Sequence, residues 1–82
     1  MKNILFINGA SVAQIIPGDG KPICLIVSDD GEAMIDVTYK AFEKYVKSLA
    51  HVFIMMNQVD EYRNFWKEID AVVKESANYD NY

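Results

Sequence analysis

Three turn dipeptides, evenly spaced in the first half of the chain, limit what this sequence can fold into. Asn8-Gly9, Asp19-Gly20 and Asp30-Gly31 follow one another at intervals of eleven residues. Asn, Asp and Gly tolerate the positive φ angles that tight β-hairpin turns require. The segments around these turns are of strand length and rich in Ile, Val, Leu and Phe, namely 3–7, 10–16, 23–28 and 32–37. We therefore predict a four-stranded antiparallel meander.

The second half of the chain has no such turns, and its apolar residues recur at about 3.6 residues instead of two. One helical stripe runs from Tyr39 to Met56, and a second stripe, one residue out of phase, runs from Val59 to Val73. Asn57 lies at the phase change and precedes an acidic first turn, which is typical of a helix N-cap. We predict two helices, roughly 38–53 and 58–76, the first of them capped by Asp36 or Thr38.

The predicted fold class is α+β, a four-stranded antiparallel β-meander followed by two C-terminal α-helices packed on the sheet. With 82 residues the chain has room for a single domain, which we place at 1–77, with a flexible tail over 78–82. One alternative stays open at this point. Residues 51–56 form a continuous apolar run, and periodicity alone does not decide whether they form a helix or a fifth strand.

Both faces of the predicted sheet are apolar, which is unusual for a sheet that has solvent on one side. A two-residue turn at Asp30-Gly31 places Val27 opposite Met34, with Leu25 on the same face, and the turn at Asn8-Gly9 pairs Leu5 with Val12. We predict a partner-binding or dimerisation face from these residues and from an aromatic residue on the flank of the second helix: Leu5, Val12, Leu25, Val27, Met34 and Phe65.

Such a second apolar face needs a cover, because monomers rarely expose large contiguous apolar patches. Either the two helices lie on opposite faces of the sheet, or the spare face binds a second copy or a different protein. A chain this short buries a limited core, and association is a common remedy.

A basic stripe on the first helix supports a function of another class. Lys40, Lys44, Lys47 and His51 recur at steps of four, three and four, so they share one helical face. This stripe could bind an anionic ligand or nucleic acid, but a solvated polar face with Glu43 next to Lys47 is the simpler explanation. The chain as a whole has twelve acidic and eight basic residues, a net charge of −4, which makes nucleic acid an unlikely partner.

The sequence lacks the residues that several kinds of binding site and catalysis require. One Cys and one His cannot form a disulfide framework or a zinc knuckle. The loop Gly18-Asp19-Gly20-Lys21-Pro22 lacks the first glycine and the Ser or Thr of a phosphate-binding P-loop. We accordingly expect no enzyme activity, no metal and no cofactor, and we expect Cys24 to be a buried small hydrophobe.

The sequence has no apolar run long enough for a signal peptide or a membrane span, so we expect a cytoplasmic protein that does not bind membranes. By size and acidity it is similar to the small accessory or inhibitory proteins that phages and mobile elements encode, a likeness of composition and not of motif. We expect a protein-binding inhibitor or regulator that acts by occupying a partner surface, and we expect it to form a homodimer.

Overall fold

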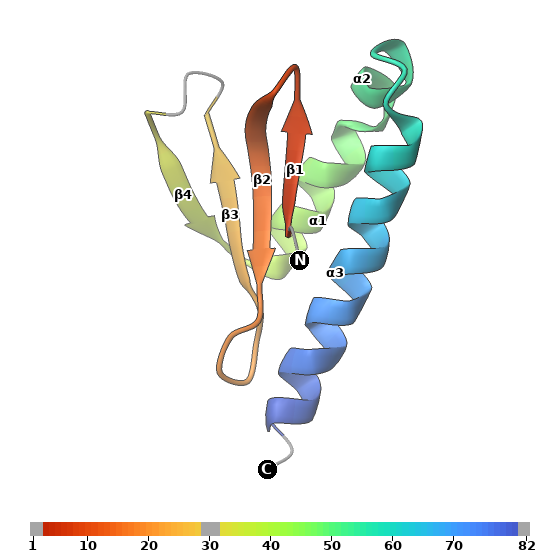
Figure 1. The fold of residues 1–82 in the computed structure, drawn as a ribbon. Helices are drawn as coiled ribbons and strands as arrows, with labels where there is room; N and C mark the ends of the chain where they lie inside the picture. The colour runs from red at the N-terminus through yellow and green to blue at the C-terminus, as the bar shows by residue number, and fades with distance from the viewer. Residues whose placement is uncertain (1–2, 29–31, 81–82) are drawn as a thin grey trace.

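The computed structural model describes residues 3–28 and 32–80, with side chains as far as Ser76. It is a four-stranded antiparallel sheet followed by three helices (Figure 1). The strands lie in chain order across the sheet, which confirms the predicted meander and the α+β class. The elements are β1 (Ile4–Ile7), β2 (Ala10–Ile16), β3 (Ile23–Val27), β4 (Met34–Val37), α1 (Tyr39–Ser48), α2 (Ala50–Met55) and α3 (Val59–Asp80).

The first hairpin has the turn that its sequence predicts. Asn8 and Gly9 have φ angles of 54° and 79°, and two consecutive positive φ values define the type I′ turn that suits the twist of a hairpin. Gly20, in the second predicted turn, has a φ of 82°. The third turn, Asp30-Gly31, lies outside the described residues. The strands that flank it nevertheless pair as predicted, with Val27 opposite Met34.

A β-bulge in β2 changes the register of the first hairpin. Phe6 lies opposite Ser11 as predicted, but Leu5 lies opposite Ala13 instead of Val12. Val12 is thus an extra residue in its strand, and a bulge of this kind turns two consecutive side chains toward the same side. Val12 and Ala13 are both buried, at 3% and 0% exposure. The predicted pairing of Leu5 with Val12 is therefore wrong.

The first predicted helix is divided into α1 and α2. The Thr38 hydroxyl caps α1 by accepting a hydrogen bond from the Ala41 N–H at 3.2 Å, so Thr38 and not Asp36 is the cap. Leu49 separates the two helices but keeps a right-handed backbone, with φ of −85° and ψ of −7°. Because α2 covers Ala50–Met55, the apolar run at 51–56 is helical, and the alternative of a fifth strand is wrong.

Asn57 ends α2 instead of capping α3, contrary to the prediction. Its φ of 58° is left-handed, and two backbone hydrogen bonds close the helix end, from Asn57 N to Ile54 O at 3.1 Å and from Gln58 N to Phe53 O at 2.8 Å. This pair of bonds defines a Schellman motif, in which Asn is one of the few residues other than Gly that accept the left-handed position. The phase change at Asn57 therefore marks a reversal of the chain between two antiparallel helices.

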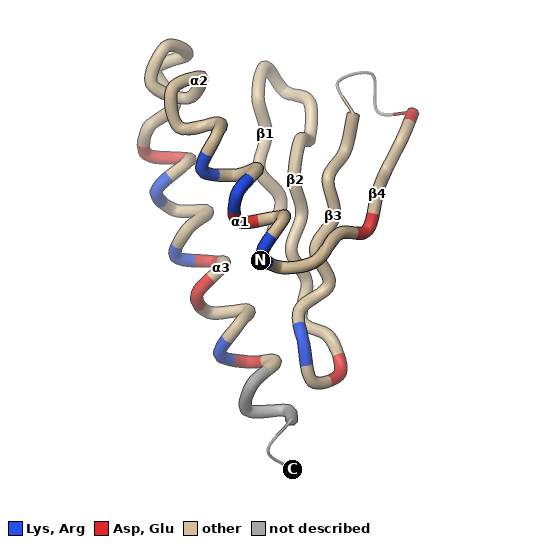
Figure 2. The backbone as a smooth tube through the Cα atoms, turned by 180° about the vertical axis from the view of Figure 1, so that it is seen from behind, with Lys and Arg blue, Asp and Glu red and all other residues tan. Residues whose placement is uncertain are grey.

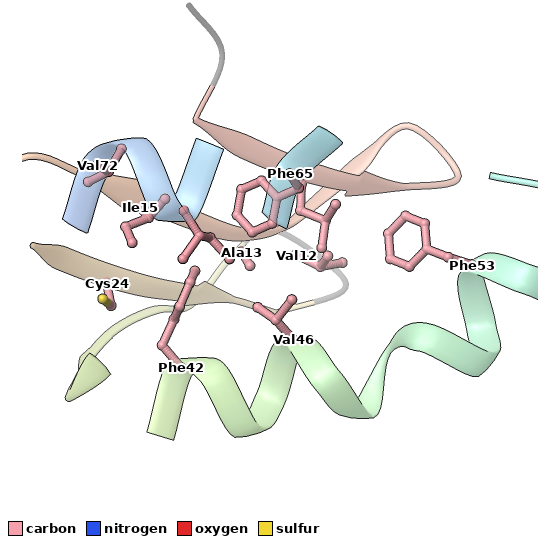
Figure 3. Close-up of a cluster of buried hydrophobic side chains, with 11 residues drawn as sticks. Val12, Ala13, Ile15, Cys24, Phe42, Val46, Phe53, Phe65 and Val72 are labelled. Atoms are coloured by element: carbon pink, nitrogen blue, oxygen red, sulfur yellow. The ribbon is translucent and has the colours of Figure 1, made fainter. Parts of the chain in front are cut away.

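The core lies between one face of the sheet and all three helices (Figure 3). On the sheet side it contains Leu5, Val12, Ala13, Ile15 and Cys24, and on the helix side Phe42, Val46, Phe53, Phe65, Ile69 and Val72. The arrangement with one helix on each face of the sheet is thus wrong, because α1, α2 and α3 all contribute to the same core. We call this side of the sheet the covered face.

The buried stripe of α3 is displaced by one residue from the predicted one. The sequence pattern centres it on Tyr62, Trp66, Ile69 and Val73, whereas the most buried positions are Phe65, Ile69, Val72 and Ser76. The cause is that α3 has two neighbours: Phe65 packs toward the sheet and Phe42, while Tyr62 stacks on Phe53 of α2 at 5.4 Å between ring centroids. A helix with two contact faces has a broader apolar stripe than one with a single face.

Hydrogen bonds at two points fasten α3 to the rest of the fold. The Tyr62 hydroxyl donates to the Val46 carbonyl near the end of α1 at 3.2 Å. Near the other end of α3, the buried Ser76 hydroxyl accepts from the Gly18 N–H at 3.4 Å. The helix continues to Asp80, so residues 78–80 of the predicted tail are helical, while 81 and 82 lie outside the described residues.

Candidate functional site

The second face of the sheet is the candidate site, because none of the described helices lies over it. In Figure 1, α1 passes behind the strands and α3 runs beside β1. Strand alternation and the observed registers assign the following residues to this side, which we call the uncovered face: Ile4, Phe6, Ser11, Gln14, Ile16, Ile23, Leu25, Val27, Met34 and Asp36. Seven of the ten are apolar, so the second face is largely apolar, and of the two arrangements left open by the sequence the structure has the one with all helices on the other face.

Exposure on the uncovered face varies along β3 and, among its apolar residues, is highest at Met34 of β4. Val27 is only 5% exposed although it does not belong to the core, and Leu25 is half-buried by its neighbours in the sheet. Ile23 is 40% exposed and Met34 is 60% exposed. A partner that docks here would therefore remove most new apolar area from water at β3 and β4.

Of the six residues predicted for the binding face, three lie on the uncovered face and three do not. Leu25, Val27 and Met34 are placed there by the β3–β4 register. Leu5 and Val12 are on the covered face, at 0% and 3% exposure, because the bulge shifts β2 by one residue relative to β1. The sequence carries one signal of this bulge, the adjacent apolar pair Val12-Ala13, which interrupts the alternation of β2.

Phe65 was the sixth predicted contact residue, and it is part of the core. It is 2% exposed, and its ring lies 6.2 Å from that of Phe42 at an interplanar angle of 55°. Phe65 therefore offers a partner almost no surface, although it lines a hollow between β1 and α3. The apolar residues of the uncovered face that the sequence pattern did not predict are Ile4, Phe6, Ile16 and Ile23.

Acidic side chains border the uncovered face on two sides. On the β4 side, Asp36 belongs to the face itself and is exposed. On the β1 side, Glu61 and Glu68 of α3 line a hollow of about 360 Å³ together with Ile4 and Phe6. Burial raises the pKa of Glu68 above its usual value. The apolar face thus has carboxylates at both of its long edges.

Basic residues are concentrated in the helices. Figure 2 shows basic positions along α1 and α3 and acidic positions on β4. Within residues 3–28 and 32–37, the part of the sheet half that the structure describes, Lys21 is the single basic residue. It lines a hollow of about 440 Å³ at one end of the sheet, where Ile23, Asp36 and Tyr39 also contribute.

The predicted basic stripe is solvent-exposed on α1 and α2. Lys40, Lys44, Lys47 and His51 are all exposed, and Glu43 forms an ion pair with Lys47 at 3.7 Å. Such an exposed pair between residues four apart adds little stability. The acidic side chain of Glu43 lies within the stripe, as expected for a solvated helix surface.

Cys24 is a buried residue of the covered face, as predicted. It is free and 0% exposed. Burial, and to a smaller extent the carboxylate of Asp36, raises the pKa of its thiol to about 11. At neutral pH the thiol is protonated, whereas nucleophilic attack and metal ligation both need the thiolate. Within the described residues, no cluster of three or more His, Cys, Asp and Glu side chains is suited to hold a metal ion.

No protein-family model matches this chain, and the searches of curated proteins and of solved structures give no match either. Over the described residues, no helix has the length and apolar character that crossing a membrane requires. The uncovered face is therefore interpreted from its own chemistry.

Proposed function

We propose that this protein is a non-enzymatic protein-binding module, an inhibitor or regulator that occupies the surface of a different protein with its uncovered face. One observation carries the proposal: Leu25, Met34 and Ile23 belong to an apolar sheet face over which no described element lies. Exposed apolar patches with a polar border are typical of sites of protein association.

The size of the face suits a binding site. Four strands spaced about 4.8 Å apart, with about five residues each at about 3.3 Å, span roughly 19 by 17 Å. This footprint of roughly 300 Å² includes three polar side chains and the nearly buried Val27. A standard interface covers about 800 Å² on each partner, so the acidic border and the ends of the strands would contribute the remaining contacts.

The charge of the border indicates the chemistry of the partner. Asp36 on one side of the face, and Glu61 and Glu68 on the other, favour a partner with an apolar centre and basic residues around it. Two copies of this chain placed face to face would bring their acidic borders together, which disfavours that kind of homodimer. A different, basic protein is the better occupant.

We place this function in the cytoplasm. A free, buried thiol and the absence of a second cysteine in the sequence suit a reducing compartment.

The test is affinity capture from cells in which the protein functions, with wild type compared with a Leu25→Asp variant. Leu25 is half-buried on the uncovered face, so an aspartate there adds a charge to the apolar centre of the interface. A partner should be retained by the wild type and lost with Leu25→Asp. The matched control is Ile54→Asp, at a residue of α2 that is 62% exposed and distant from this face in the fold.

Purified partner and protein are then titrated at several salt concentrations. Binding through the uncovered face should survive a double Lys40→Ala/Lys44→Ala substitution. Loss of binding in that double variant, with a steep decrease in affinity as salt rises, would instead assign the function to the basic stripe. Equal capture of every protein by wild type and Leu25→Asp would refute the uncovered face as the binding site.

A further inference from the structure

The outer edge of β4 is the second unpartnered feature of the sheet. β4 is the last strand in the sheet order, and no described element lies beside it in Figure 1. The opposite edge strand, β1, has α3 next to it. Met34 is 60% exposed and Ile35 is 59% exposed, and because they are adjacent in a strand they point to opposite sides of the sheet. A partner that lies on one face alone would cover only one of these side chains.

The backbone groups of β4 that point away from β3 can be identified from the hydrogen bonds. Ser28 N donates to Ala33 O at 2.9 Å, so these opposite residues form a hydrogen-bonded pair. In an antiparallel ladder such pairs alternate with non-hydrogen-bonded pairs, and Ile26–Ile35 is therefore the next bonded pair along the register. The N–H and C=O groups of Met34 and Asp36 accordingly point outward, toward the open edge.

A hydrogen bond on the other side of the sheet gives the same alternation. Ile15 N donates to Asn3 O in the direction of β1, so Ile15 and its opposite residue Cys24 are not a bonded pair. Cys24 must then bond toward β4, to Val37, which again leaves the backbone groups of Asp36 directed outward. Two independent hydrogen bonds therefore agree that the backbone groups of Asp36 point toward the open edge of the sheet.

We propose that a second copy of this chain pairs with this edge, so that β4 and its symmetry mate form an antiparallel ladder centred on Ile35. A strand added to the edge covers Met34 on one side of the sheet and Ile35 on the other. It also satisfies the outward backbone groups of Met34 and Asp36. The edge shares Met34 and Asp36 with the uncovered face, but the pairing uses their outward backbone groups, and the inference does not depend on the proposed function.

Charge selects the register of the pairing. In β4 the even-numbered residues direct their backbone groups outward. A ladder between two copies must pair these residues with one another, so its two-fold axis can pass through residue 34, 35 or 36. A ladder centred on residue 36 places Asp36 opposite Asp36 of the second copy, and one centred on residue 34 places Asp36 opposite Glu32. Both registers are disfavoured because like charges directly opposite each other are destabilising. Centring on 35 places Met34 opposite Asp36 and Glu32 opposite Thr38, without a like-charge pair.

The expected dimer is weak and enlarges the uncovered face. A four-residue strand pairing gives an interface at the low end of the size range for specific association. In the dimer the two sheets join, so that the uncovered faces of both copies become one surface. The pairing therefore leaves the proposed partner-binding residue Leu25 accessible.

The experiment measures the solution mass by light scattering between about 10 μM and 1 mM, a range that covers weak association. The mass should rise from 9.3 kDa toward twice that value as the concentration increases. Asp36→Pro removes an outward N–H without removing a ladder bond to β3, and proline is tolerated at strand edges. It should weaken the dimer at least tenfold, while Asp36→Asn, which keeps the N–H, should dimerise as well as wild type. Circular dichroism checks that each variant is folded.

Cross-linking tests the register separately. In the proposed ladder the two Ile35 residues face each other as a non-hydrogen-bonded pair, with Cα atoms about 4.5 Å apart, a separation that a disulfide can bridge. Ile35→Cys should form a covalent dimer under mild oxidation and Met34→Cys should not, while wild type shows that buried Cys24 does not react. A wild type that stays at 9.3 kDa throughout, or preferential cross-linking of Met34→Cys, would overturn the proposal. Both results are independent of whether Leu25→Asp loses a partner.

Discussion

The two faces of the sheet are similarly apolar, but their side chains have different surroundings. On the covered face, Leu5, Ile15 and Cys24 are all 0% exposed beneath three helices. On the uncovered face, Met34 is 60% exposed and Val27 is 5% exposed, while at the β4 edge Ile35 of the covered face is 59% exposed. Hydrophobicity therefore does not distinguish the two faces. The distinction arises because all three helices pack on one face, toward which the bulge in β2 turns both Val12 and Ala13. The comparison teaches that an apolar strand pattern can serve either a core or an outer surface.

The largest difference between the two faces is expected when an aspartate is placed on each of them, at neighbouring positions of β2. Val12→Asp should prevent folding, because it buries a carboxylate without a partner at a cost of several kcal/mol. Ser11→Asp, one residue away on the uncovered face, should change the free energy of unfolding by less than about 1 kcal/mol. Urea denaturation followed by circular dichroism measures both. Similar effects of the two substitutions would show that the bulge does not separate the faces as described.

A pair of leucine truncations gives a finer measure of the same difference. Leu5→Ala leaves a cavity in the core, and we expect it to lower the free energy of unfolding by about 2–5 kcal/mol. Leu25→Ala is the same chemical change on the uncovered face and should cost about 1 kcal/mol or less. The two values come from denaturant midpoints at constant slope. A larger cost for Leu25→Ala would mean that a second copy already covers that face, which the light-scattering mass would reveal.

The pKa of the Cys24 thiol indicates how well the covered face is shielded from water. Its pKa is about 11 in the folded protein, compared with 9.0 for the unperturbed group. The unfolded chain therefore loses its proton first, so stability is unaffected below pH 9 and falls as the pH rises from 9 to 11. We expect a loss on the order of 1–3 kcal/mol over this range.

The comparison variant for this pH dependence is Cys24→Ala, which lacks the thiol. Burial also raises the pKa of Tyr39, and the charge of Cys24 contributes to that shift, so the comparison is made in a Tyr39→Phe background, where this tyrosine cannot ionise. Parallel stability curves with and without Cys24→Ala in this background between pH 9 and 11 would contradict the assignment of a dry environment to this thiol.

The smallest expected effect concerns a polar contact within the covered layer. Tyr62→Phe removes the hydrogen bond from the hydroxyl to the Val46 carbonyl and keeps the ring stacked on Phe53. We expect a loss of about 0.5–1.5 kcal/mol in the free energy of unfolding. Tyr39→Phe is the control, because the contact of Tyr39 with Glu43 is long, at 3.5 Å, and its removal should cost less. Equal losses would show that the Tyr62 contact is not specific.

Much of the fold could be predicted from local sequence, and the errors have a common origin. The hairpin register at Val27–Met34 was correct, and Thr38 was one of the two predicted caps, because turn and cap chemistry depends on a few adjacent residues. Leu5, Val12 and Phe65 were assigned to the wrong surface. Their placement depends on which side chains meet across the core, and a period of two or of 3.6 residues does not contain that information.

By itself, the sequence determined the four strands, the helical second half, and the presence of more apolar surface than one small core can bury. These properties follow from backbone preferences and composition, which act over a few residues. Only the tertiary structure decided which face is covered. The bulge at Val12 turns two neighbouring side chains inward, and packing against both the sheet and α2 rotates α3 until Phe65 is buried. Burial is a relation between distant segments, and it is settled only when they pack together.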